Sequence, residues 1–132
     1  MLFKNTLATL TLLLAICLTF LHAYPIALEV GDKASVTLSK LDGKITFTQI
    51  DPTNLEVDGK FNQGITDENT DNYSVCIEDS CETFTELGVV IHVPGTEPFK
   101  ATGPGLIEII VGKTLSVQYK GKPIDSGIIA KI

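Results

Sequence analysis

Oxygen-bearing side chains between positions 67 and 78 are spaced like the ligands of a calcium-binding loop. Asp67, Asn69, Asp71 and Glu78 occupy the first, third, fifth and twelfth positions of that pattern. Two features oppose it: no flanking helices are predicted, and a strand is expected to begin inside the loop at Tyr73. The stretch therefore predicts a solvated acidic turn. Weak extracellular calcium binding by Asp67, Asp71 and Glu78 is the alternative.

The cysteines Cys76 and Cys81 lie in the same part of the chain. Four residues separate them, which suits a disulfide across the end of a hairpin, whereas a redox CxxC motif would need two. A secreted chain is expected to oxidise such a pair, so we predict a Cys76–Cys81 disulfide. The alternative is a copper or zinc site in which both thiolates and His92 are ligands.

Asn72-Tyr73-Ser74 is an N-x-S sequon between the acidic positions and the cysteines. In a secreted eukaryotic protein Asn72 would be a glycosylation acceptor, although a strand that begins at this point would hinder attachment.

No catalytic residue is predicted. Nucleophilic catalysis needs a nucleophile with an oriented base and acid, and the sequence has no G-x-S-x-G stretch to present a serine. Acid pairs that include Asp58 would need to face each other across a cleft to hydrolyse a glycoside, and so short a domain offers little cleft. Gly103-Pro104-Gly105 lacks the following lysine and the helix of a phosphate-binding loop.

The first 23 residues have the features of a secretory signal peptide. Lys4 precedes an uncharged apolar run from Leu7 to Leu21, and Ala23 provides a small residue at a cleavage point. A transmembrane anchor is the alternative, but the run is shorter than the roughly 20 residues that a span needs. We therefore expect a secreted chain with one domain, residues 24–132, and no transmembrane span in it.

The remaining chain is acidic and contains no arginine. The formal net charge of −6 for the whole sequence becomes −7 when Lys4 leaves with the signal segment. Nucleic acids and anionic membrane surfaces are poor partners for such a chain, because phosphate binding needs clustered cations. An unknown extracellular or cell-surface molecule is the partner that we expect.

Alternating apolar and polar residues predict short strands along most of the domain. The predicted strands cover residues 26–30, 34–38, 45–50, 55–61, 73–78, 83–86, 89–93, 107–111, 114–119 and 128–132. The polar stretch 64–71 and the stretch 94–105, which contains three prolines, are predicted loops. No segment shows a helical period, so the pattern predicts an all-β antiparallel sandwich or barrel.

Three parts of the sequence resemble copper/zinc superoxide dismutases. Lys33–Gln49 is similar to the first hairpin of that family, and Val57–Ile65 to its third strand and the turn after it. Ile110–Lys120, followed by Ser126–Lys131, is similar to its last two strands. The resemblance lies in the order and spacing of these parts, and it implies an antiparallel Greek-key β-barrel of about eight strands.

The positions at which that family binds copper carry other residues here. In the register of the resemblance, Ser74 and Cys76 replace two ligand histidines and Gln118 replaces a third. Ser126 replaces a half-cystine, the catalytic arginine has no counterpart, and the long zinc-binding and electrostatic loops are missing. No metal or other cofactor is expected, because such sites need several imidazole nitrogens and His92 is the only histidine after the signal segment.

These features predict a secreted, non-catalytic superoxide-dismutase-like domain with a binding or structural role outside the cell. The alternatives are a copper or zinc protein of this family with an unorthodox site, and a weak calcium-binding module.

Overall fold

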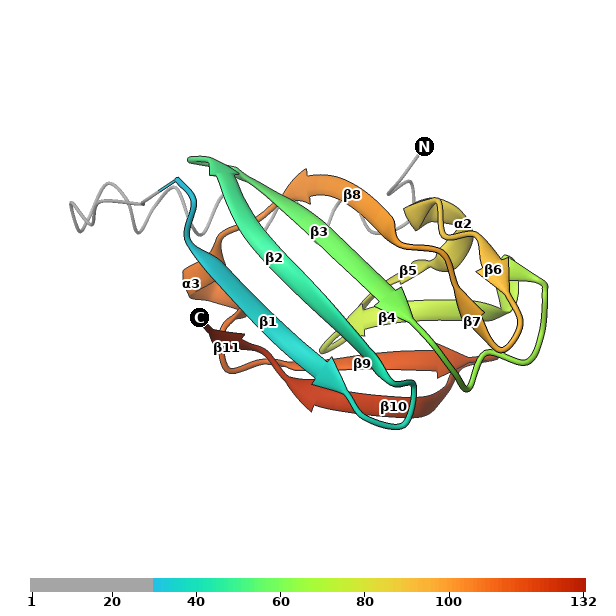
Figure 1. Ribbon diagram of the computed structural model, residues 1–132. Helices are drawn as coiled ribbons and strands as arrows, with labels where there is room; N and C mark the ends of the chain where they lie inside the picture. The colour runs from blue at the N-terminus through green and yellow to red at the C-terminus, as the bar shows by residue number, and fades with distance from the viewer. Residues whose placement is uncertain (1–29) are drawn as a thin grey trace.

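The computed structural model describes residues 30–132, which form two antiparallel β-sheets packed face to face (Figure 1). Sheet A contains β1 (Lys33–Leu38), β2 (Gly43–Asp51), β3 (Asn54–Phe61), β8 (Phe99–Pro104) and β11 (Ala130–Lys131). Sheet B contains β4 (Tyr73–Ile77), β5 (Ser80–Thr83), β9 (Thr114–Tyr119) and β10 (Lys122–Ile128). A separate pair and three short helices complete this part of the chain: β6 (Ile91–His92), β7 (Gly95–Thr96), η1 (Thr70–Asn72), α2 (Phe84–Leu87) and α3 (Ile107–Ile110).

The predicted all-β antiparallel fold is confirmed. The strand order is β11-β1-β2-β3-β8 in sheet A and β10-β9-β4-β5 in sheet B. β8 and β5 are the terminal strands of their sheets and do not pair with each other, so the described residues form a sandwich. The predicted signal segment, residues 1–23, and nearly all of the strand predicted over 26–30 lie outside the described residues. Within residues 30–132, no helix has the length and apolar character to cross a membrane.

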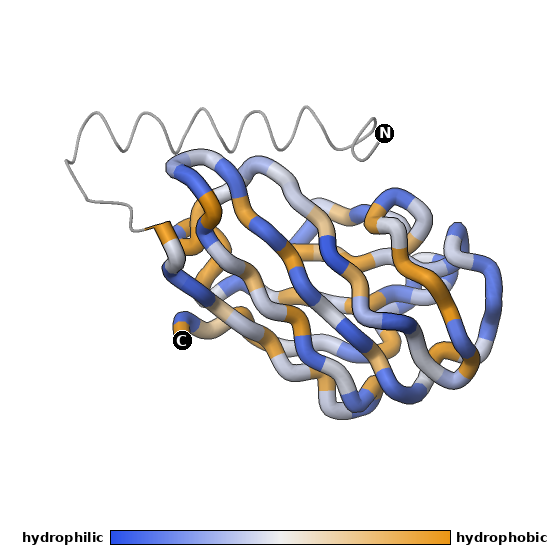
Figure 2. Tube along the Cα trace, turned by 45° about the horizontal axis from the view of Figure 1, so that its top comes forward, coloured by the Kyte–Doolittle hydropathy of each residue, from blue (hydrophilic) through white to orange (hydrophobic). Residues whose placement is uncertain are grey.

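The period-two pattern of the sequence places one face of each sheet in the core. Val36 lies directly opposite Ile45, and Ala34 directly opposite Phe47, so these side chains share the inner face of sheet A. Figure 2 shows hydrophilic and hydrophobic residues following one another along the strands. An aromatic series, in which each ring contacts the next, runs through the core: Tyr119, Tyr73, Phe84, Phe61 and Phe99.

One side of the sandwich is held together by Asp125 of β10. Its side chain is buried, and Oδ2 accepts hydrogen bonds from the backbone N–H groups of Lys40 (2.8 Å) and Leu41 (3.1 Å), in the turn between β1 and β2. Gly127 lies so close to β1 that an added Cβ would be 2.7 Å from a methyl carbon of Val36. The two sheets are therefore joined at the side where β10 contacts β1. They are open at the opposite side, where β5 and β8 are the edge strands.

Gln49 fixes the end of sheet A beside that open side. Its side chain is fully buried, and Nε2 donates to the carbonyl groups of Asp51 (2.8 Å), Asn54 (3.1 Å) and Gly105 (3.1 Å). Oε1 accepts from the backbone N–H of Ile107 at 2.9 Å, at the start of α3. The amide thus joins the β2–β3 turn to the segment that follows β8.

Two predicted strands are wrong, because residues 83–86 and 107–111 contribute to the short helices α2 and α3. Thr83 and Glu86 form a capping box, in which Glu86 N donates to Thr83 Oγ1 and Thr83 N donates to Glu86 Oε1, both at 3.0 Å. Gly88 ends α2 with a left-handed φ of 71°. In α3, Ile107 and Ile110 are one turn apart and both enter the core.

The predicted loop 94–105 is also wrong, since it contains β7 and β8. Proline is tolerated in β8 because this strand is the edge of sheet A and Pro104 is its last residue. Of the strand predicted over residues 89–93, only β6 is formed. The strand predicted over residues 128–132 corresponds to the last residue of β10 and to β11.

Candidate functional site

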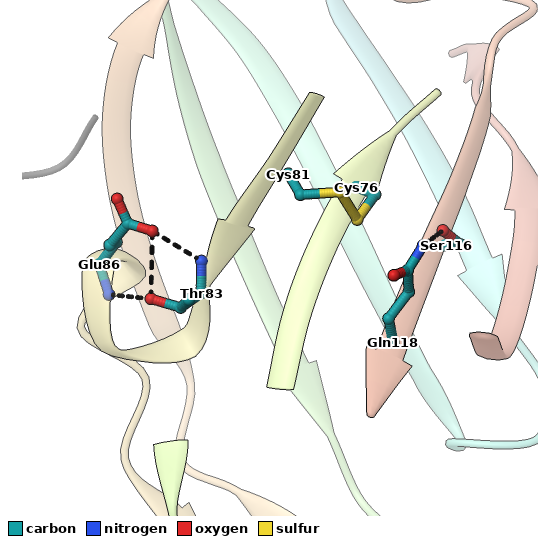
Figure 3. Close-up of a disulfide and its surroundings, with 6 residues drawn as sticks. All are labelled: Cys76, Cys81, Thr83, Glu86, Ser116 and Gln118. Atoms are coloured by element: carbon teal, nitrogen blue, oxygen red, sulfur yellow. Dashed lines mark hydrogen bonds between the residues drawn. A yellow bond between two sulfur atoms is a disulfide. The ribbon is translucent and has the colours of Figure 1, made fainter. Parts of the chain in front are cut away.

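The three positions that the resemblance assigns to copper ligands are neighbours on the outer face of sheet B. Ser74 of β4 lies directly opposite Gln118 of β9, and Cys76 lies two residues further along β4, opposite Ser116. Gln118 Nε2 donates to Ser116 Oγ at 3.5 Å (Figure 3). A hydroxyl, an amide and a bridged sulfur do not fit copper, which is bound by imidazole nitrogens and thiolates.

The predicted disulfide is confirmed. Cys76 and Cys81 lie directly opposite each other in the β4–β5 hairpin, with an S–S distance of 2.02 Å and a Cα–Cα distance of 4.0 Å (Figure 3). Because both sulfurs are bridged, neither is a thiolate ligand. His92 lies on β6 and is hydrogen-bonded to Glu97. Within residues 30–132, no three His, Cys, Asp or Glu side chains gather in a way that could hold a metal ion.

The predicted calcium ligands do not come together. Asp67 and Asp71 precede β4, whereas Glu78 follows it in the turn to β5, so the five-residue strand separates them by roughly 17 Å. Glu78 is exposed in that turn, with a positive φ of 51°.

The carboxylate of Asp67 is instead satisfied by the protein. Oδ1 accepts from Asn69 N (2.9 Å), and Oδ2 accepts from Asn72 Nδ2 (2.8 Å) and Tyr119 Oη (2.8 Å). These hydrogen bonds hold the pKa of Asp67 below its usual value, and the bond to Asp67 raises the pKa of Tyr119. The group joins the loop before β4 to the end of β9 and has a structural role.

Asn72, the predicted glycosylation site, is half-buried at the end of η1. Its Nδ2, the atom to which a glycan would be joined, donates to Asp67. Its carbonyl accepts from Lys120 N at 2.7 Å. A glycan at Asn72 would take one of the two Nδ2 protons beside the Asp67 carboxylate, and glycosylation stays a prediction.

A cavity between the sheets is the site that the sequence analysis missed. It has a volume of about 390 Å³ and lies at the open side of the sandwich, where residues of β5 and β8 contribute to its wall. The wall is mainly apolar and comes from the inner faces of both sheets and from the helices α2 and α3; it includes Phe47, Leu55, Val57, Val75, Ile77 and Phe99.

Glu82 places a carboxyl group on this apolar wall. It lies opposite Val75 in the β4–β5 hairpin, so both side chains are on the inner face of sheet B. Its Oε2 is buried and has no hydrogen-bond partner among the described residues. Burial, and secondly the negative charge of Glu86, raise the pKa of Glu82 to about 8. The carboxyl is therefore largely protonated at pH 7.

The cysteine spacing contained the signal for this site. A disulfide between directly opposed strand residues fixes the hairpin register and puts Cys81 on the same face as Cys76, so Glu82, the next residue, shares the face of the apolar Val75. The cavity itself depends on the missing pairing between β5 and β8, which are separated along the chain by α2, β6 and β7.

A scan of the sequence against protein-family models finds no match, and a search of curated proteins finds no relative. The resemblance to copper/zinc superoxide dismutases therefore depends on the quoted residues alone.

Proposed function

We propose that this protein is a secreted, non-catalytic binding protein on a superoxide-dismutase-like scaffold, and that it binds a small, mainly apolar molecule in the cavity between β5 and β8. The cavity carries the proposal. Its volume of about 390 Å³ is within the range of about 300–1,000 Å³ that small-molecule sites have. A mainly apolar wall with a small number of polar groups, among them Glu82, is also the usual composition of such a site.

The residues on the outer face of sheet B support a non-catalytic role. Ser74, Cys76 and Gln118 are neighbours there, and their side chains do not supply the nitrogen ligands of a redox copper ion. The sequence contains no arginine to attract a superoxide anion. Purified protein supplied with copper is expected to show no dismutation above free copper; stoichiometric activity would contradict this part of the proposal.

Secretion is supported by the N-terminal segment and by the Cys76–Cys81 disulfide, which persists in oxidising compartments. Expression of the complete chain in a secreting cell should release a protein whose first residue is Tyr24. Mass spectrometry of the medium tests this, and retention of an intact chain in the membrane fraction would refute secretion.

A cavity-filling variant tests the binding function. 1-Naphthylmethanol, a neutral fluorescent compound, is titrated against the purified protein. Ala101→Phe adds a ring on the inner face of β8, opposite Val57, and should reduce the affinity about tenfold or more by filling the cavity. Lys100→Phe adds the same ring on the exposed face of the same strand and is the matched control. Absence of saturable binding, or equal loss in both variants, would refute the proposal.

A further inference from the structure

We infer that the ligand of this cavity is an apolar molecule that carries a basic amine, whose ammonium group pairs with the carboxyl of Glu82. This inference rests on the proposed binding function and adds the chemical class of the ligand.

The position of Glu82 is the first argument. Of the charged residues on the cavity wall, Glu82 is the one that lies in a strand, where it is directly opposite the apolar Val75. Oε2 is buried without a hydrogen-bond partner in residues 30–132. Leaving a buried acceptor unpaired costs free energy, which a ligand that donates a hydrogen bond there would recover. A donor at the end of an apolar body therefore fits this site.

The charges around the cavity are the second argument, and they favour a cationic donor. Glu78, Asp79 and Glu82 are on the wall, against the single cation Lys113. Lys113 adjoins Thr114, whose carbonyl accepts from Glu78 N, so Lys113 lies at the turn end of the β4–β5 hairpin with Glu78 and Asp79. At the other end of β5, the charged group that acts on Glu82 is Glu86 of α2, which is negative. An ammonium ion is attracted by these groups, and a carboxylate is repelled.

The coupling between the ligand and the Glu82 proton is the third argument. Free Glu82 has a pKa of about 8 because its charged form is poorly solvated. An ammonium group in contact stabilises the carboxylate and lowers the pKa of Glu82, so binding near neutral pH releases a proton. Affinity for an amine should therefore increase with pH up to about 8 and then level off, while affinity for a neutral compound should not.

Three naphthalenes that differ in one group test the inference: 1-naphthylmethylamine, 1-naphthylmethanol and 1-naphthoate. At pH 8 the amine should bind the wild-type protein about tenfold or more tightly than the alcohol, and the naphthoate more weakly than both. Calorimetry in two buffers of different ionisation enthalpy should show, at pH 6.5, release of nearly one proton per bound amine and none per bound alcohol.

Two variants assign the effect to Glu82. Glu82→Gln should remove the preference for the amine and the proton release, so that the amine and the alcohol bind this variant with affinities within about threefold of each other. Glu86→Gln, which removes a neighbouring charge and keeps a residue that can complete the capping box, should retain most of the preference.

The outcomes separate the two proposals. If the amine and the alcohol bind equally, or the naphthoate binds most tightly, the assignment to an amine is overturned and the binding function stands. If none of the three compounds binds, the binding function and the assignment to an amine are both overturned. The comparison of ligands uses the wild-type protein, so it decides the question even if a variant fails to fold.

Discussion

Val75 and Glu82 lie directly opposite each other across β4 and β5, on the inner face of sheet B. Val75 packs against the hydrophobic core, and Glu82 places a carboxyl group on the apolar wall of the cavity. On the outer face of the same hairpin, the next pair along is Cys76 and Cys81, which the disulfide joins. Because the disulfide holds the register, Glu82 stays on the inner face of sheet B as long as the strands remain paired.

Glu82→Gln should stabilise the protein at alkaline pH. The pKa of Glu82 is raised from 4.5 to about 8, so the unfolded chain loses this proton at lower pH than the folded protein does. The contribution of Glu82 to the free energy of unfolding therefore falls as pH rises from about 4.5 to 8. Glutamine has no proton to lose, so the variant should exceed wild type by about 1–2 kcal/mol at pH 8.5, after allowance for partial contact with solvent.

Urea denaturation at pH 4.5 and pH 8.5 measures this difference. The two proteins should be equally stable at pH 4.5. Glu108→Gln, at an exposed position of α3, is the control and should match wild type at both pH values. An equal stability of Glu82→Gln and wild type at pH 8.5 would show that the Glu82 carboxyl is solvated.

Gln49→Leu should be strongly destabilising. The amide bonds to three carbonyl groups and to Ile107 N, and leucine would leave these buried groups without partners. We expect a loss of about 3 kcal/mol in the free energy of unfolding. Gln118→Leu is the matched control, because Gln118 has one long hydrogen bond on the outer face, and it should cost less than about 1 kcal/mol. Similar losses in both variants would contradict this account of Gln49.

The strands with a clear period of two were predictable from sequence, as β1, β2, β3 and β9 show. The two errors in segment type have physical causes. At Thr83 a capping box outweighs β-branched propensity. At Ile107 the backbone N–H donates a buried hydrogen bond to Gln49, which is distant in sequence, and a helix starts there. The inward position of Glu82 could have been predicted from the disulfide and the alternation of β4. The cavity could not, because it depends on the absence of pairing between β5 and β8.

Calcium should not stabilise the protein. Glu78 lies at the far end of β4 from Asp67 and Asp71, and the oxygens of Asp67 already accept hydrogen bonds from the protein. A native-state ligand raises the melting temperature, so the melting temperature should be the same in millimolar calcium and in chelator. A rise of several degrees with calcium would restore the calcium-binding alternative.

Reduction of the Cys76–Cys81 disulfide should lower stability only modestly. The bridge closes a short loop, so the chain-entropy model gives a contribution of roughly 2 kcal/mol. The double variant Cys76→Ser/Cys81→Ser should therefore remain folded and unfold at a lower urea concentration. If this variant retains wild-type stability, the hairpin register is held by strand pairing alone.

Histidines introduced at Ser74 and Gln118, two of the positions that the resemblance assigns to copper ligands, should create a metal site. Ser74 and Gln118 lie directly opposite each other on β4 and β9, and paired residues have Cβ atoms about 5 Å apart, so two imidazoles there can approach one ion. Ser74→His/Gln118→His should bind Cu²⁺ about tenfold or more tightly than either single variant, as measured by competition with a coloured chelator. Ser74→His/Ser116→His is the control, because Ser116 lies opposite Cys76, two pairs along the ladder from Ser74. If the paired variant binds no better than its singles, Ser74 and Gln118 are not neighbours, and the register of the superoxide-dismutase resemblance is wrong.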